Sequence, residues 1–222
     1  MSSSTSSSET RWRGFAVTFT LAAAALVSAL LAFAFLVDPY DSGRSPLTLK
    51  PGVSPQGPRT AAASRGRDPQ FSGAIFGNSH IQLVSPEALK QQTGIAFVSL
   101  IAPATGPREA LVLLDWFLRH RTEPAKALVI GIDVRWCTPD ASLPVEKPFP
   151  FWLFERSPAA YLAGLMRFDV IEEIPRRLRY QTAKAPQRAR PDGFWNYEEG
   201  YEVQGFHNDP ARRARLLEPI QS

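Results

Sequence analysis

The feature that most constrains this chain is an uncharged apolar run over residues 15–37. A helix of this length spans about 30 Å, the thickness of the hydrocarbon core of a bilayer. A helix buried inside a soluble protein seldom lacks a polar face. The alternative is a cleaved signal peptide, and Ala32-Phe33-Ala34 weakly resembles a cleavage site, but such peptides have an apolar core of about 7–15 residues. The run therefore predicts one uncleaved transmembrane helix.

The charges on either side of the run predict its orientation. Arg11 and Arg13 precede it, whereas Asp38 and Asp41 follow it. The positive-inside rule then places the N-terminus in the cytoplasm and everything after Asp38 outside it. The first ten residues are Ser-rich and of low complexity, so residues 1–14 are expected to form a disordered cytoplasmic tail. The predicted location is the cell membrane, with a single pass and an extracytoplasmic domain.

Residues 38–70 are rich in Pro, Gly, Ser and Arg and show little periodicity. This composition predicts a linker or stalk. Its first residues, Asp38-Pro39-Tyr40-Asp41, have two interpretations. They either dock on the folded domain or place Tyr40 at the membrane surface as an aromatic anchor.

The remaining residues, 71–222, are expected to form an α/β domain. Apolar strand candidates alternate with helix candidates, and the connections between them are short, which is typical of a parallel sheet. The strand candidates are residues 74–76, 95–100 and 127–132, and the last of these is expected to be buried on both faces. Helices are predicted at residues 86–92, between Ser85 and Gly94, and from Pro107 to about residue 121, where Arg119-His120-Arg121 close the helix.

Several polar residues follow these strands at their carboxyl ends. Gly77 permits a sharp bend after the first strand, and Asn78 and Ser79 come next. The 102–106 loop follows the second strand, and Asp133 follows the third. These segments should therefore share the edge where open α/β sheets bind their ligands. Ser79 could act there as a nucleophile if a base reaches it, although such a serine more often only satisfies a turn.

Residues 134–156 contain many prolines and aromatics, which predicts a long irregular loop that serves both as a hydrophobic flap over the sheet edge and as a lid or binding wall. A helix is expected over residues 158–180, with a possible break at Pro175. Its residues Arg176, Arg177 and Arg179 are expected to form a solvated face. Because only three strands are evident, the domain is expected to be incomplete at its C-terminus.

Composition excludes several kinds of site. The net charge of +4 is not concentrated in a basic motif, which argues against nucleic-acid binding. The single cysteine, Cys137, permits no intrachain disulfide, and no Cys/His cluster has zinc-ligand spacing. Neither a Gly-x-Gly-x-x-Gly motif nor a Walker lysine follows the first strand. We expect neither a metal nor a cofactor.

The element order and three motifs resemble the SGNH (GDSL-like) hydrolases. The motifs are Gly77-Asn78-Ser79-His80, Thr105-Gly106-Pro107-Arg108-Glu109 and Gly131-Ile132-Asp133. The resemblance covers roughly residues 38–215 and is greatest to the membrane-anchored, extracytoplasmic branch, which includes proteins that transfer acyl groups to cell-surface polysaccharides. It implies a three-layer parallel sheet, flavodoxin-like or SGNH-like, preceded by one transmembrane helix.

The resemblance also implies roles for individual residues. Ser79 matches the nucleophile, and Gly106 is the nearest match to the glycine of the oxyanion hole. Asp133 stands where the family usually has an asparagine. The base and its orienting carboxylate come in this family from a C-terminal Asp-x-x-His motif, which this sequence lacks.

The missing motif leaves the source of the base open. His80 is expected to be a poor base for Ser79, because adjacent side chains on a turn generally point apart. His207 could fold back, although nothing in its spacing requires this. We therefore expect either a shortened enzyme or a relative without catalysis.

Two functions remain in competition. One is an esterase or O-acyltransferase acting on an acylated cell-surface glycan, with the glycan or a membrane acyl-donor protein as its partner. The other is a non-catalytic membrane-anchored protein that binds a glycan or a partner enzyme, with exposed Trp136 and Trp152 suited to stacking on sugars.

Overall fold

A computed structural model describes residues 6–54, 57–137, 148–184 and 190–194 of the chain. The chain divides into two compact units. Unit 1 combines residues 1–55 with residues 151–188, and unit 2 combines residues 56–150 with residues 189–222. The division differs from the expected single domain over residues 71–222, because residues 151–188 group with the N-terminal helix instead of with the sheet.

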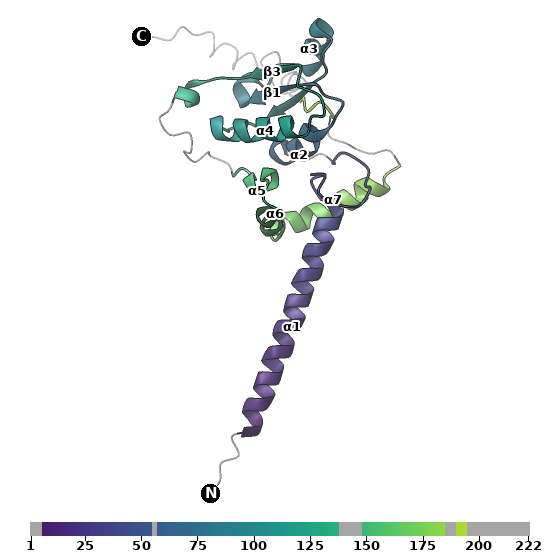
Figure 1. The fold of residues 1–222 in the computed structure, drawn as a ribbon, viewed down its shortest axis with the longest axis vertical. Coiled ribbons are helices and arrows are strands. Elements are labelled where there is room, and N and C mark those ends of the chain that lie inside the picture. The colour runs from purple at the N-terminus through teal and green to yellow at the C-terminus, as the bar shows by residue number, and fades with distance from the viewer. Residues whose placement is uncertain (1–5, 55–56, 138–147, 185–189, 195–222) are drawn as a thin grey trace, which may run out of the picture. The chain divides into compact units, whose positions relative to one another are not determined.

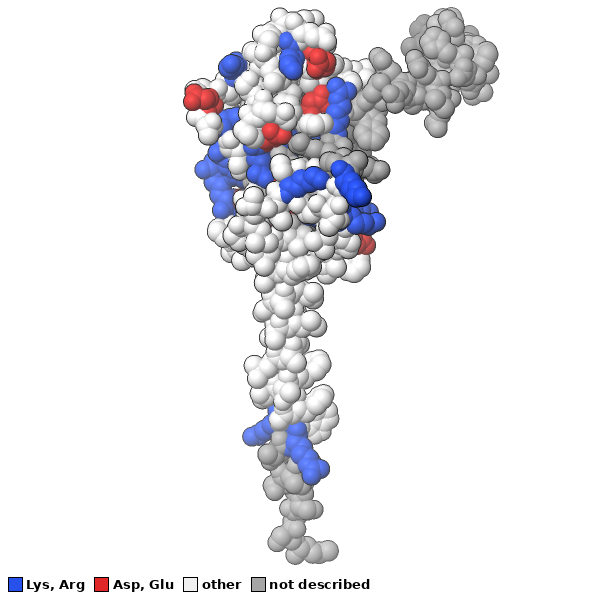
Figure 2. All heavy atoms as spheres, turned by 90° about the vertical axis from the view of Figure 1, so that its right-hand side faces the viewer, with Lys and Arg blue, Asp and Glu red and all other residues white. Residues whose placement is uncertain are grey.

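Unit 1 begins with the long helix α1, Ser6–Val37. Within it, Arg11–Val37 is long and apolar enough to cross a membrane, and little of that stretch is buried. Figure 2 shows an uncharged surface along α1 between the basic residues near its N-terminal end and the rest of the unit. The helix already includes residues that were expected in a disordered tail, because extending an existing helix costs far less than nucleating one.

In the described part of unit 1, three further helices follow in the second half of the chain: α5 (Phe151–Phe154), α6 (Pro158–Leu165) and α7 (Phe168–Thr182). Helices α6 and α7 run across the C-terminal end of α1 (Figure 1). The break in the expected helix falls at Met166 and Arg167, not at Pro175, which lies inside α7. A proline removes one helical hydrogen bond, but the buried side chains of Ile174 and Arg177 fix α7 on either side of it.

The segment after α1 forms part of the unit 1 core. Residues 38–42 are all buried, and Tyr40 is only 2% exposed. The Tyr40 ring lies 5.8 Å from that of Trp152, which also packs on Gly164. The docking interpretation of Asp38-Pro39-Tyr40-Asp41 is therefore the one that the structure supports, with α5 to α7 as the docking surface. Trp152 is half-buried in this packing, so it is not the freely exposed ring expected of a sugar-stacking wall.

Arg177 does not lie on a solvated face. Its guanidinium is buried, lies 3.3 Å from the Asp41 carboxylate and donates to the backbone carbonyl of Gly52. Asp41 also accepts a hydrogen bond of 2.6 Å from the Gly52 amide. The sequence pattern of α7 gave no sign of this partner, because Asp41 lies far away in the chain. Arg176 does lie at the surface, paired with Glu173.

Unit 2 begins with helix α2, Pro58–Arg67, inside the segment expected to be a stalk. Residues 61–63 of α2 are alanines with almost no exposed surface. They allow close packing on the sheet and on α4 (Pro107–Arg119), which lies beside α2 in Figure 1. Trp116 of α4 donates a 3.0 Å hydrogen bond to the Ala63 carbonyl. The small residues thus serve helix packing, not linker flexibility.

Within the described residues, the sheet of unit 2 has three parallel strands in the order β2-β1-β3. These are β1 (Gly73–Gly77), β2 (Phe97–Ile101) and β3 (Ala127–Ile130). Helix α3 (Pro86–Thr93) connects β1 to β2, and α4 connects β2 to β3. Ser85 caps α3 by accepting from the Ala88 amide, and Gly94 ends it in the left-handed conformation. The predicted α/β class with a parallel sheet is confirmed.

The central strand β1 is covered from both sides. Ile75 clusters with Phe97 and with Leu89 of α3, whereas Phe76 contacts Phe117 of α4 at a ring distance of 6.1 Å. Since successive strand residues point to opposite faces, α3 and α4 pack on opposite sides of β1.

Strand β3 was expected to be buried on both faces, and this prediction is wrong. Leu128 and Ile130 are 40% and 39% exposed. Strand β3 pairs with β1 and lies at one side of the described sheet, and only its other face, with Val129, packs into the apolar cluster around Ile75. An apolar run does not reveal which strand will lie at the side of a sheet.

Candidate functional site

The first part of the candidate site is the turn that follows β1. Gly77 has a φ of 154°, and a Cβ there would lie 2.9 Å from the Ile81 side chain, so the turn requires glycine. Asn78 then caps the short 3-10 helix η1, Ser79–Ile81, by accepting a 3.0 Å hydrogen bond from the His80 amide. Ser79 is the first residue of η1 and is exposed. Its position is compatible with a nucleophile.

The second part is Asp133, which follows β3 and precedes η2, Val134–Cys137. The Asn78 side-chain amide donates to Asp133 Oδ2, and it also donates to the Thr105 carbonyl at 3.4 Å. Asn78 therefore joins the exits of all three strands. The sequence predicted that the segments after the three strands share one edge of the sheet, and these two hydrogen bonds of Asn78 show that they are in contact there.

His80 contacts the same carboxylate. Its Nδ1 lies 3.1 Å from Asp133 Oδ2, while 69% of its side chain is exposed. An ionised carboxylate can only accept hydrogen bonds, so Nδ1 carries the proton in this contact. Nε2 of a neutral His80 is then an acceptor, which is the tautomer that a general base requires.

The environment of Asp133 favours its charged form. The hydrogen bond from Asn78 contributes most to lowering the pKa of Asp133, against the opposing effect of its burial. The Arg135 amide, at 3.0 Å from Oδ1, and His80 lower this pKa further. The carboxylate is therefore ionised at neutral pH and can hold the imidazole of His80 in place.

Sequence reasoning missed the pairing of His80 with Asp133. It considered His80 only as a partner of the adjacent Ser79, and among the described residues no hydrogen bond joins these two side chains. The signal that could have revealed the pair is topological, because both residues leave neighbouring strands at the same edge. Of the other two histidines, His120 follows the C-terminal end of α4, away from Gly106, and its Nδ1 lies 2.7 Å from the Trp116 carbonyl oxygen. His207 lies outside the described residues.

The expected oxyanion donor Gly106 has another partner. Its amide donates a 2.8 Å hydrogen bond to the carboxylate of Glu109, a residue that is only 4% exposed. This bond caps α4, and binding an oxyanion would have to break it. The Ser79 amide, by contrast, has no acceptor among the described residues. Ser79 N–H is therefore the better-placed donor for an oxyanion beside its own hydroxyl.

The location of the site follows from the strand order. The chain moves from β1 to β2 on one side and then returns past β1 to β3. Ligands of open α/β sheets bind outside the carboxyl ends of strands where the order reverses in this way. Ser79 and His80 follow β1, and Asp133 follows β3, so the three residues span this switch point.

Comparisons of the chain with protein-family models, with curated proteins and with solved structures found no match. Within the part of the chain that the structure describes, no group of His, Cys, Asp and Glu side chains is arranged to hold a metal ion. The functional groups that the structure brings together at this edge are a hydroxyl, an imidazole, a carboxylate and backbone amides.

Proposed function

We propose that this chain is a membrane-anchored, extracytoplasmic esterase or O-acyltransferase of the SGNH-like type. Its substrate is an acylated cell-surface glycan or a similar ester, and Ser79 is the nucleophile. The observation that carries the proposal is the 3.1 Å contact between His80 Nδ1 and Asp133 beside the exposed Ser79. Asp133 and His80 would replace the absent Asp-x-x-His motif.

The proposed reaction proceeds through an acyl-enzyme. Ser79 Oγ attacks the carbonyl carbon of the ester while His80 Nε2 accepts the hydroxyl proton, and Asp133 stabilises the imidazolium. The Ser79 amide donates to the oxyanion as the leaving alcohol departs with the proton from His80. Water or a glycan hydroxyl then attacks the acyl-serine while His80 Nε2 accepts its proton. The acyl group leaves on this acceptor, and His80 returns the proton to Ser79 Oγ.

The proposal requires His80 to turn toward Ser79 when substrate binds. Catalytic hydrogen bonds are often long in ligand-free enzymes and tighten only in the substrate complex. His80 has room to turn because most of its side chain is exposed. Rotation that keeps Nδ1 near Asp133 would leave Nε2 to approach the serine.

The membrane placement is supported by α1. Its stretch Arg11–Val37 is long and apolar enough to cross a bilayer, and Arg11 and Arg13 lie at the N-terminal end of that stretch. The positive-inside rule favours a cytoplasmic N-terminus and an extracytoplasmic site. Such a location suits an enzyme whose acceptor is a cell-surface polysaccharide or whose donor is a membrane protein.

The test is to incubate the full chain in detergent with p-nitrophenyl acetate and to search for acetyl-Ser79 by peptide mass spectrometry. We expect acetylation of Ser79 in the unaltered chain and none in Ser79→Ala. His80→Gln should abolish it, whereas His120→Gln, at the opposite end of α4, should not. Failure to acetylate Ser79 in the folded chain would contradict the proposed catalysis.

A second candidate is a non-catalytic glycan-binding protein. Two observations favour it: the missing bond between Ser79 and His80, and the engagement of the Gly106 amide by Glu109. Trp136 is half-buried beside Asp133, whose carbonyl accepts a 3.0 Å bond from the Trp136 amide, so its ring could stack on a sugar. In cells, this candidate predicts that Trp136→Ala abolishes function and that Ser79→Ala preserves it. Trp152→Ala would instead test the folding of unit 1.

A further inference from the structure

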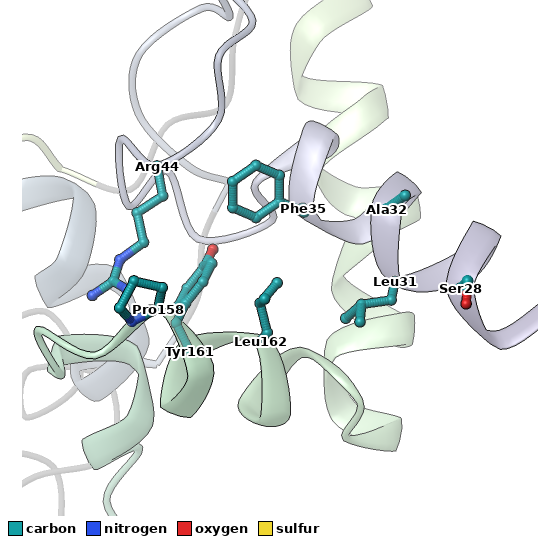
Figure 3. Close-up of a pocket in the computed structure, with 8 residues that line it drawn as sticks. All are labelled: Ser28, Leu31, Ala32, Phe35, Arg44, Pro158, Tyr161 and Leu162. Carbon is teal, nitrogen blue, oxygen red and sulfur yellow. The ribbon is translucent and has the colours of Figure 1, made fainter.

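An apolar groove of about 730 Å³ lies between α1 and α6 in unit 1 (Figure 3). Its walls include Leu31 and Phe35 of α1 and Leu162 of α6. The volume is within the range of pockets that enclose a small ligand.

The groove is apolar along its length and cationic at one end. Ser28 lines one end, and the guanidinium of Arg44 lies at the other (Figure 3). The wall that α1 contributes, from Ser28 to Phe35, is therefore about 10 Å long along the helix axis. Arg44 is half-buried, and its guanidinium carbon lies 4.3 Å from the ring centre of Tyr161. The Tyr161 hydroxyl is held by Ser42, so the aromatic ring forms a fixed support under the cation.

Arg44 retains donors for a ligand. It donates to the Glu155 backbone carbonyl, but it forms no ion pair with a carboxylate among the described residues. The nearby Asp38 carboxylate is 2% exposed and accepts hydrogen bonds from Ser42 and Gly43. A guanidinium has five N–H donors, and a phosphate oxygen is a well-matched acceptor for them.

We infer that the groove binds a membrane phospholipid, with one acyl chain along Leu31, Phe35 and Leu162 and the headgroup phosphate on Arg44. The inference rests on the proposed membrane anchoring. In that placement the end at Ser28 points toward the bilayer centre, and Arg44, which follows the membrane span, lies at headgroup level. The groove then runs from its apolar end in the bilayer to Arg44 at the surface, which is the same direction in which a membrane lipid runs from its acyl tail to its phosphate.

The surface of the adjoining helices agrees with this placement. Met166 and Phe168, at the junction of α6 and α7, are 63% and 74% exposed, and Ile171 of α7 is 49% exposed. Large apolar side chains beside charged ones are typical of helices that lie in the membrane interface. They would extend the apolar surface on which the bound lipid rests.

The experiment uses the full chain in detergent micelles with trace phosphatidylglycerol that carries a diazirine in one acyl chain. After irradiation, labelled peptides are mapped by mass spectrometry. We expect label concentrated on the α1 segment near Phe35 and on α6. Leu31→Trp, which fills the groove, should remove this enrichment, whereas Leu30→Trp, on the opposite face of α1, should preserve it. Ala32→Trp provides a second groove-filling variant, and thermal melting verifies that each variant is folded.

The phosphate contact is tested separately. Arg44→Gln should lower the labelling about tenfold, the loss expected for one charge-assisted hydrogen bond. A diazirine diacylglycerol, which lacks the phosphate, should label the unaltered chain as weakly as the phospholipid labels Arg44→Gln. Uniform labelling around α1, or equal labelling by both lipids, would overturn the inference.

Membrane anchoring has its own readout, which is retention of the chain in carbonate-washed membranes. Extraction of the chain would refute the anchoring and the lipid site together. Retention with uniform labelling would refute the lipid site alone. Neither measurement depends on Ser79, so the proposed catalysis can fail without affecting them.

Discussion

Replacement of Asp41 by alanine should strongly destabilise unit 1. The side chains of Asp41 and Arg177 are only 6% and 1% exposed, and they lie 3.3 Å apart. Asp41→Ala removes the carboxylate that also accepts from the Gly52 amide, and it leaves the Arg177 guanidinium buried without that partner. Breaking a buried pair by removing one member typically costs about 3–5 kcal/mol. For a chain of this size the cost corresponds to a fall in melting temperature of roughly 6–20 °C.

The assay is thermal unfolding of the full chain in detergent, followed by circular dichroism. Glu173→Ala is the matched control, because it removes a pair on the same helix in which the Arg176 side chain is 50% exposed, and it should cost about 1 kcal/mol or less. The double variant Asp41→Leu/Arg177→Met should be more stable than Asp41→Ala, since it leaves no buried charge at this pair. Equal melting of Asp41→Ala and the Glu173→Ala control would refute the reasoning.

Three further results are expected. The carboxyl NMR resonance of Asp133 should titrate with a pKa below the ordinary value of 3.8, and Asn78→Ala should raise that pKa. The stability that ionised Asp133 contributes should therefore be complete above pH 3.8 and be lost as the pH falls through the lower folded pKa. Gly66→Val should destabilise unit 2 by about 1–3 kcal/mol in urea unfolding, because even a Cβ at Gly66 would lie 2.7 Å from the Trp116 ring. Ile132→Thr should change stability by less than about 0.5 kcal/mol in the same assay, because Ile132 is 73% exposed.

Local sequence signals predicted local structure well. Ser85 is the N-cap of α3 and Gly94 is its C-cap, as the capping preferences of these residues predict. Pro107 is the first residue of α4. The alternation of apolar strands and helices predicted the parallel sheet. That topology in turn predicted that the segments bearing Ser79 and Asp133 would share an edge, and the hydrogen bonds of Asn78 now connect them.

Features that depend on distant partners could not be predicted. Strand β3 has the composition of a central strand, yet lateral strand order is fixed by chain crossovers that leave no mark on its residues. Arg177 resembles its exposed neighbours in sequence, and only the return of Asp41 to α7 buries it. Similarly, the pairing of His80 with Asp133 depends on the register of β1 with β3. The catalytic role of Ser79 stays a prediction.

The most direct test of the proposed site is the rate at which a fluorophosphonate modifies Ser79. If His80 and Asp133 activate the serine together, Asp133→Asn and His80→Gln should each slow the reaction by on the order of 10³–10⁴. Asp115→Asn, which removes an exposed carboxylate from α4, should leave the rate unchanged. The account predicts rapid labelling of Ser79 that requires both partners. Absence of labelling in the folded chain, or labelling that is indifferent to His80 and Asp133, would contradict it.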